Sequence, residues 1–119
     1  MSKSARSVFI FGLYLGVLGV VLLVIPNFLL GIFQFPSTNE VWIRVVGMLV
    51  FLLGGYYILA ARKEVTDFFQ WTVYLRPTVI LFFIAFVLLD YSSPLLILFG
   101  AVDLLGAIWT GLLLRASNG

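Results

Sequence analysis

The sequence predicts an all-α integral membrane protein, an antiparallel four-helix bundle with both termini on the cytoplasmic side. Composition is the first indication: of 119 residues, 63% are hydrophobic and 10% are charged, and the mean hydropathy is +1.20. A soluble domain of this size needs a larger polar surface, because small domains leave much of their chain exposed. The second indication is four apolar segments, each near the roughly 20 residues that cross a bilayer core of about 30 Å.

The four predicted helices follow one another closely. They run over about residues 8–25, 41–61, 68–89 and 95–114, and the first could continue past Pro26 toward Phe35. The connectors at 36–40, 62–67 and 90–94 are short and carry polar or helix-breaking residues. Short connectors make sequential helices antiparallel neighbours. We therefore expect residues 1–119 to form a single transmembrane domain.

The basic residues predict the orientation. One side of a four-span arrangement carries Lys3, Arg6, Arg62, Lys63 and Arg115. An excess of Lys and Arg marks the cytoplasmic face, so both termini are expected there. The first apolar run is too long for a cleaved signal peptide and no small-residue cleavage site follows it, so we expect it to be retained.

Several function classes are disfavoured by the residues that the chain lacks. There is no cysteine, which excludes disulfides and thiol chemistry. There is no histidine, which removes the usual haem ligand, the commonest zinc ligand and the commonest general base. We therefore expect no metal site. The net charge of +2 comes from scattered residues, which argues against a nucleic-acid partner.

Asp103 is the most costly residue of the sequence, because it lies inside the apolar run LFGAVDLLGAIWTG at 98–111. An Asp at a helix centre costs about 2.5–3.5 kcal/mol on insertion scales and usually faces the bundle or a cavity. Arg44, near the outer end of the second span, and Arg76, near the middle of the third, could each approach it. Arg44 could equally extend its side chain to the nearby interface. The sequence does not decide which arginine is the partner.

The third span adds polar tips at Gln70, Trp71 and Tyr74 in its cytoplasmic half. With Asp103, Arg76 and Arg44, these residues form the candidate ligand site or buried charge network. Ionisable groups in membranes are functional candidates by default, yet a pair that neutralises itself needs no ligand. A structural clamp and a polar pocket therefore remain alternatives.

Small residues recur along the spans at helical spacing and predict close helix packing. The candidates are Gly12, Gly16, Gly47, Gly54, Gly100 and Gly106. Small residues let helix backbones approach each other in lipid, where hydrophobic gain is small. Ordinary bundle packing explains these glycines better than an ion or ligand path.

Four stretches resemble small bacterial four-helix membrane proteins that are distantly similar to the DoxX-like group. They are PNFLLGIFQFPSTNEVWIRVVG, GGYYILAAR, FFQWTVYLRP and LFGAVDLLGAIWT. The resemblance covers nearly the whole chain and implies a four-helix bundle in the bacterial inner membrane. It also directs attention to Arg44, Arg76 and Asp103. Some DoxX relatives are linked to quinone-coupled sulfur oxidation, but the sequence has no redox cysteine or metal motif for that activity.

Three function classes follow from these residues. The first is a protein that binds a lipid, a quinone or another amphipathic molecule, or an accessory subunit of a larger membrane complex. The alternative is a small transporter or channel that acts as a homo-oligomer and uses Asp103 in the membrane. An intramembrane enzyme is the third class, but no Ser–His, Cys–His or metal set can be assembled. We expect membrane lipid as a partner, and no cofactor beyond a bound lipid or quinone.

Overall fold

The computed structural model describes residues 1–90 and 94–118, and this part of the chain is helical with no strand. The helices are α1 (Lys3–Val24), α2 (Pro26–Ile32), α3 (Trp42–Arg62), α4 (Thr66–Leu88) and α5 (Leu96–Asn118). By length and composition, α1, α3, α4 and α5 could each cross a membrane. The structure thus confirms the predicted all-α class and its four long apolar helices. Residues 91–93 of the third predicted connector lie outside the described part.

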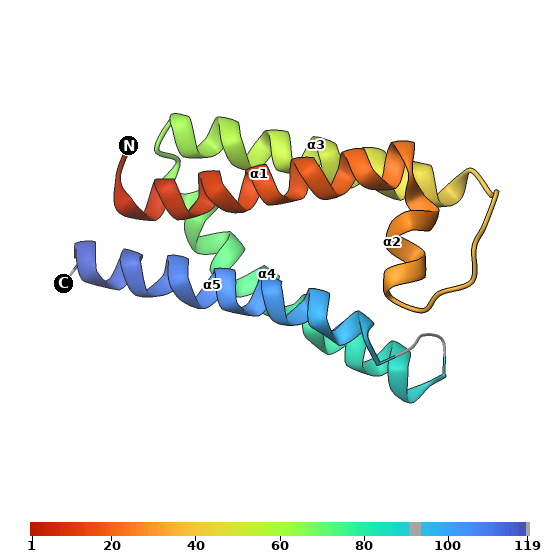
Figure 1. Ribbon diagram of the computed structural model, residues 1–119. Coiled ribbons are helices and arrows are strands. Elements are labelled where there is room, and N and C mark those ends of the chain that lie inside the picture. Colours follow the sequence, from red (N-terminus) through yellow and green to blue (C-terminus); the bar gives the residue numbers. More distant parts are fainter. Residues whose placement is uncertain (91–93, 119) are drawn as a thin grey trace.

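The break between α1 and α2 comes from Pro26. A proline lacks the backbone N–H that an unbroken helix needs and disfavours helical geometry in the residue before it. Ile25 accordingly leaves the helical region, with φ −132° and ψ 60°, and Pro26 starts α2 as a new helix. The first helix therefore does not continue past Pro26. Instead, α2 turns away from α1 toward the other pair of helices (Figure 1).

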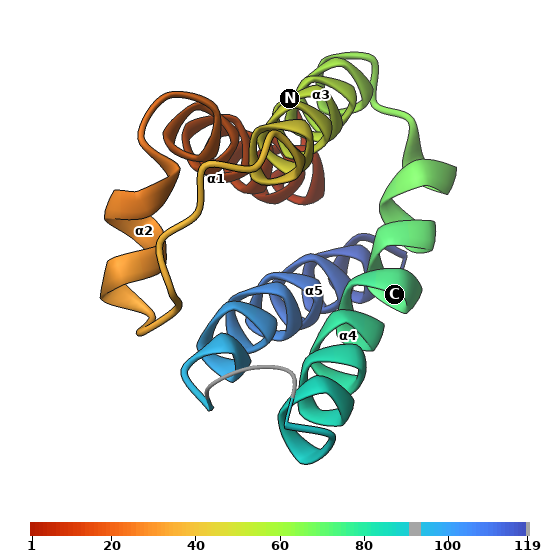
Figure 2. The same ribbon diagram turned by 90° about the vertical axis from the view of Figure 1, so that its right-hand side faces the viewer.

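The four long helices pack as two pairs. α1 lies along α3 and α4 lies along α5, while contacts between the pairs are made mainly by α1 with α5. Both termini lie at one end of the molecule, and the pairs separate toward the other end (Figure 1). Figure 2 shows the α1–α3 pair and the α4–α5 pair on opposite sides, with α2 at the edge of the space between them.

The main cluster of buried hydrophobic residues lies toward the end that holds the termini. Its members come from all four long helices: Ala5, Val8, Phe11, Leu15, Tyr57, Ala61, Phe69 and Leu114.

Glycines bring α1 and α3 into backbone contact. A Cβ atom on Gly54 would lie 2.7 Å from the carbonyl oxygen of Gly12, and a Cβ on Gly47 would lie 2.9 Å from the carbonyl oxygen of Gly19. Both distances are too short for a real side chain, so these crossings require glycine. Gly16 differs, because a Cβ there would meet nothing within 4 Å.

A similar contact joins α4 and α5. A Cβ on Gly100 would lie 2.7 Å from the Cα atom of Ile80. Because glycine has no side chain, the two helix backbones approach closely. Dispersion forces then hold the helices together in lipid, where the hydrophobic effect contributes little.

Candidate functional site

Arg76 lies at the meeting point of the two helix pairs. Its side chain, from the middle of α4, is only 3% exposed. Nη2 donates hydrogen bonds to Thr110 Oγ1 on α5 at 2.9 Å and to Thr72 Oγ1 at 3.3 Å. Nε donates a longer bond of 3.4 Å to the carbonyl oxygen of Thr72. A guanidinium is thus buried among hydroxyl and carbonyl acceptors.

A directed chain of hydrogen bonds continues from Arg76 to α1. Ser7 Oγ donates to the carbonyl oxygen of Ser4 at 2.7 Å and lies 2.8 Å from Thr110 Oγ1. A hydroxyl has one hydrogen and an arginine only donates. Since the Ser7 hydrogen is already used, Thr110 donates to Ser7 and accepts from Arg76. The network therefore joins α4, α5 and α1.

Two aromatic rings cover the guanidinium. Its central carbon lies 4.7 Å from the centre of the Phe11 ring and 5.9 Å from the centre of the Tyr57 ring. The two rings also contact each other, with centroids 5.7 Å apart. A cation over an aromatic face gains about 2 kcal/mol or more when both are desolvated. Tyr57 thereby adds α3 to the set of helices that surround the charge.

One nitrogen of the guanidinium remains unused. Nη1 of Arg76 is buried and has no hydrogen-bond partner among the described residues. It faces α5 at Gly106, where a Cβ atom would come within 3.1 Å of it. A buried donor without an acceptor costs about 1–3 kcal/mol, and more when it is charged. Nη1 is therefore the atom of this network whose hydrogen-bonding capacity is unused.

Asp103 is near this network but is not bonded to it. The carboxylate is half-buried, and it interacts electrostatically with Arg76, Tyr14 and Tyr57. Among the described residues it forms no ion pair with Arg76, whose Nε and Nη2 donate to Thr72 and Thr110. The direct Asp103–Arg76 pair, one of the alternatives that the sequence left open, is thus not formed.

Arg44 is exposed near the start of α3 and contacts α1. Its Nη1 donates to the carbonyl oxygen of Leu23, in the last turn of α1. The last carbonyl groups of a helix lack partners within that helix, and a basic side chain satisfies them well. Arg44 therefore caps α1 and does not approach Asp103.

The remaining predicted site residues point away from Arg76. Trp71 and Tyr74 are 60% and 76% exposed, and Gln70 is exposed as well. Residues at these positions of α4 fall on a different face from Thr72 and Arg76, which lie one turn apart. The predicted site therefore combined residues from two different faces of α4: the exposed face of Gln70, Trp71 and Tyr74, and the buried face of Arg76.

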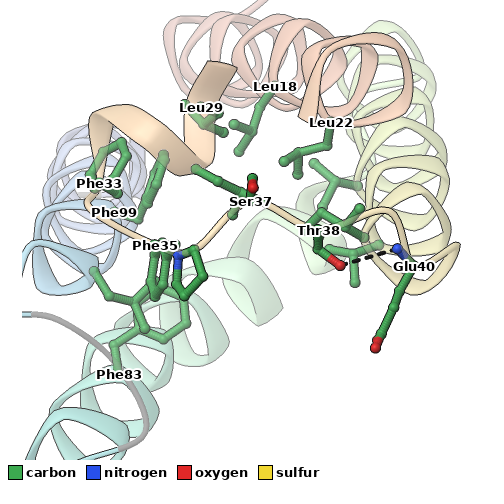
Figure 3. Close-up of a pocket in the computed structure, with 16 residues that line it drawn as sticks. Leu18, Leu22, Leu29, Phe33, Phe35, Ser37, Thr38, Glu40, Phe83 and Phe99 are labelled. Carbon is green, nitrogen blue, oxygen red and sulfur yellow. Dashed lines mark hydrogen bonds between the residues drawn. The ribbon is translucent and has the colours of Figure 1, made fainter. Parts of the chain in front are cut away.

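An apolar cavity of about 650 Å³ occupies the space where the helix pairs separate. Figure 3 shows its wall, to which α1 contributes Leu18 and Leu22, α4 contributes Phe83 and α5 contributes Phe99. The segment after α2 covers one side. There the Phe33 ring stacks on Phe99, with centroids 4.2 Å apart.

The cavity and the charged network involve the same faces of the four long helices. Tyr14 is one helical turn from the cavity residue Leu18, and Asp103 is one turn from the cavity residue Phe99. Residues four apart share a helix face. In the same way, Arg76 and Tyr57 are seven residues from cavity residues of their own helices, Phe83 and Val50. We call Tyr14, Tyr57, Arg76 and Asp103 the polar cluster. The polar cluster lies one to two helical turns from these cavity residues, toward the termini.

The predicted site set lacked several residues of this site: Ser7, Phe11, Tyr14, Tyr57, Thr72 and Thr110. Hydroxyls and aromatic rings in apolar helices have many uses, so none of these residues carries a specific signal. On either side of Pro77, Arg76 donates to the carbonyl oxygen of Thr72, and the Thr78 hydroxyl donates to the carbonyl oxygen of Leu75 at 2.6 Å.

No protein-family model, no curated protein and no solved structure matches the chain. The resemblance to DoxX-like proteins therefore stays a prediction, and the function has to be argued from the geometry of the site.

Proposed function

We propose that this chain is a small integral membrane protein that binds an amphipathic molecule, a lipid or a quinone, between its two helix pairs. One observation carries the proposal: an apolar cavity of about 650 Å³ lies one to two helical turns from a cluster of polar groups, of which Tyr57 and Arg76 are buried. Ligand pockets of about 300–1,000 Å³ with mostly apolar walls and a few polar groups are typical of small-molecule sites.

The walls and the polar cluster suit different parts of such a ligand. The apolar portion fits among Leu22, Phe83 and Phe99 in the cavity, where it replaces contacts that the separated helices lack. A carbonyl or anionic oxygen of the ligand would accept a hydrogen bond from Nη1 of Arg76, which has no partner. Asp103 would accept a hydrogen bond from a ligand hydroxyl or balance the charge of the arginine.

The same proposal includes an orientation. We place both termini in the cytoplasm and the chain in the bacterial inner membrane, because basic residues gather at the end that holds the termini. They include Lys3, Arg62, Lys63 and Arg115. The cavity then lies in the outer half of the bilayer and the polar cluster nearer its middle. A role as an accessory subunit is compatible with this arrangement.

The test compares a substitution that fills the cavity with a matched one on the outer surface. Leu18 lines the cavity, whereas Leu81 on α4 is 64% exposed. Protein extracted in mild detergent is studied by native mass spectrometry, and its organic extract is identified. We expect wild type and Leu81→Trp to retain a bound lipid or quinone, and Leu18→Trp to lose at least nine-tenths of it.

Circular dichroism establishes that both variants keep their helices. Two results would overturn the proposal: wild-type protein without any bound amphipathic molecule, or Leu18→Trp protein that retains as much as wild type.

A further inference from the structure

A second concave region lies between α4 and α5, and none of its residues lines the cavity described above. At the end near the C-terminus, a pocket of about 300 Å³ is lined by Gln70, Val73, Tyr74, Gly111, Leu114 and Arg115. A smaller pocket of about 220 Å³ is lined by Val73, Pro77, Ala107, Ile108, Gly111 and Leu112. The two pockets share Val73 and Gly111, so they form one continuous groove, which we call the α4–α5 groove.

The polarity of the groove changes along its length. At the end near the C-terminus, Arg115 supplies a positive charge, Gln70 an amide and Tyr74 a hydroxyl, and all three side chains are exposed. At the other end every lining side chain is apolar. A concave surface with a cationic, hydrogen-bonding end and an apolar extension matches a molecule with an anionic head and a hydrocarbon tail.

The dimensions fit one leaflet of a bilayer. Arg115 and Ala107 are eight residues apart on α5, which corresponds to about 12 Å along a helix axis. A leaflet contributes about half of the 30 Å hydrocarbon core. The groove thus extends from the level of the lipid headgroups into the part of the acyl chains nearest to them.

Gly111 keeps the groove open where its two parts join. A Cβ atom there would already lie 3.3 Å from Val73 Cγ1, so a larger side chain would occupy the floor of the groove. The neighbouring Trp71 is 60% exposed on the same end of α4. Exposed tryptophan at this level is typical of the membrane–water interface.

We propose that the α4–α5 groove binds one anionic phospholipid, with its phosphate at Arg115, Gln70 and Tyr74 and an acyl chain along Gly111 and Ala107. The phosphate oxygens accept hydrogen bonds, and all three polar side chains can donate them. The charge on Arg115 favours a headgroup with a net negative charge over a zwitterionic one. This site does not depend on a ligand in the cavity.

The experiment titrates the detergent-purified full chain with phosphatidylglycerol or phosphatidylcholine, and native mass spectrometry gives the Kd of the first bound lipid. Wild type is expected to bind phosphatidylglycerol more tightly. In Arg115→Gln the Kd for phosphatidylglycerol should rise about fivefold, as a basic residue near an anionic surface contributes roughly 1 kcal/mol. The preference over phosphatidylcholine should disappear.

Arg62→Gln is the matched control, because Arg62 ends α3 at the same end of the molecule and lies outside the groove. Its Kd should change less than twofold. Gly111→Leu should weaken both lipids by filling the floor, and circular dichroism checks its folding. Glycerol 3-phosphate in excess should leave the lipid-bound fraction unchanged, whereas displacement would mean that the site recognises phosphate alone.

Equal effects of Arg115→Gln and Arg62→Gln, or equal wild-type affinity for the two lipids, would overturn the proposal. The Leu18→Trp variant separates this site from the cavity, since it should bind phosphatidylglycerol in the groove as wild type does. Failure of either site in these tests leaves the result for the other intact.

Discussion

The Nη2 atom of Arg76 lies 2.9 Å from the Oγ1 atom of Thr110, and this hydrogen bond joins α4 to α5 where the two helix pairs meet. Thr110 is fully buried, and its hydroxyl donates a hydrogen bond to the Ser7 hydroxyl on α1. A charged side chain is therefore held without direct contact with a carboxylate, by two hydroxyls and two aromatic rings. The stability of the junction should depend on these neutral groups.

Replacing Thr110 with valine is expected to destabilise the fold by about 1–3 kcal/mol, the cost of a buried donor that loses its acceptor. The change keeps the shape of the side chain and removes only the hydroxyl, so Nη2 keeps just the longer bond to Thr72. Thermal or SDS-induced unfolding in detergent micelles, followed by circular dichroism, measures the effect.

Thr78→Val is the control for this prediction. The hydroxyl of Thr78 also lies on α4, but it bonds only to the carbonyl oxygen of Leu75 in its own helix. We expect a change below about 0.5 kcal/mol, as for substitutions away from buried networks. Equal destabilisation by the two valines would show that the Arg76–Thr110 bond adds nothing specific.

Two glycines of α1 and α3 should respond oppositely to alanine. In Gly54→Ala the new methyl group would lie 2.7 Å from the Gly12 carbonyl oxygen and 2.8 Å from the Gly16 nitrogen, so α1 and α3 would have to separate. Overpacking of this kind typically costs about 1–3 kcal/mol. In Gly16→Ala the methyl group meets nothing within 4 Å.

Gly16→Ala is therefore expected to be neutral or to stabilise α1 by up to about 1 kcal/mol, because alanine is the better helix former. The same unfolding measurement compares the two variants directly. If Gly16→Ala destabilised the protein as much as Gly54→Ala, the packing of α1 on α3 described above would be incorrect.

The fold was predictable because its main determinants are local. Apolar length and short polar connectors locate the four long helices, although α1 begins at Lys3, before the predicted start near residue 8, and ends before Pro26. Proline was correctly seen as a feature near the end of α1, but sequence does not tell whether a helix bends or restarts. Here Ile25 leaves the helical region and α2 starts anew.

The site was less predictable because it depends on which faces of different helices meet. The sequence singled out Arg76 and Asp103 by their cost in lipid, and the structure places both near the meeting point of the pairs. It could not predict that neutral groups would hold Arg76, since Ser7 and Phe11 are ordinary residues of an apolar helix. The cavity was also beyond reach, because it results from the separation of whole helix pairs.

Glu64 should make the first turn of α1 sensitive to acid. Its carboxylate accepts hydrogen bonds from the Ser2 backbone N–H at 2.5 Å and from the Ser2 hydroxyl at 2.7 Å. These bonds, the backbone bond first, hold the pKa of Glu64 below its usual value, because they favour the ionised form. Their stabilisation is present at neutral pH and is lost as the pH falls through the lowered pKa, below the ordinary value of about 4.3.

Hydrogen exchange measures this effect at the amides of the first turn, where the Ser2 hydroxyl also caps α1 by accepting from the Ala5 N–H. At neutral pH, Glu64→Gln should exchange faster than wild type, and the two should converge in acid. Glu40→Gln, at the opposite end of the molecule, should behave as wild type throughout. A wild-type advantage that was already lost at a pH well above the usual pKa of glutamate would contradict the assignment.

Asn27 should control access to the cavity, because its side chain holds the segment that covers one side of it. Asn27 Oδ1 accepts from the Thr38 N–H at 2.9 Å, and Asn27 Nδ2 donates to the Thr38 carbonyl oxygen at 3.2 Å. Thr38 itself lines the cavity (Figure 3). In Asn27→Ala, both bonds are lost, so residues 34–40 should exchange their amide hydrogens faster and a bound amphipathic molecule should dissociate faster. The free energy of unfolding should fall only by about 1–2 kcal/mol, since both bonds are exposed.

Asn27→Asp keeps the acceptor and loses the donor, so its exchange rate should lie between those of wild type and Asn27→Ala. Unchanged exchange at 34–40 in the alanine variant would mean that this pair of bonds does not hold the segment. Faster exchange without faster dissociation would instead place the entry route elsewhere, between α3 and α4, where the helix pairs have few contacts with each other.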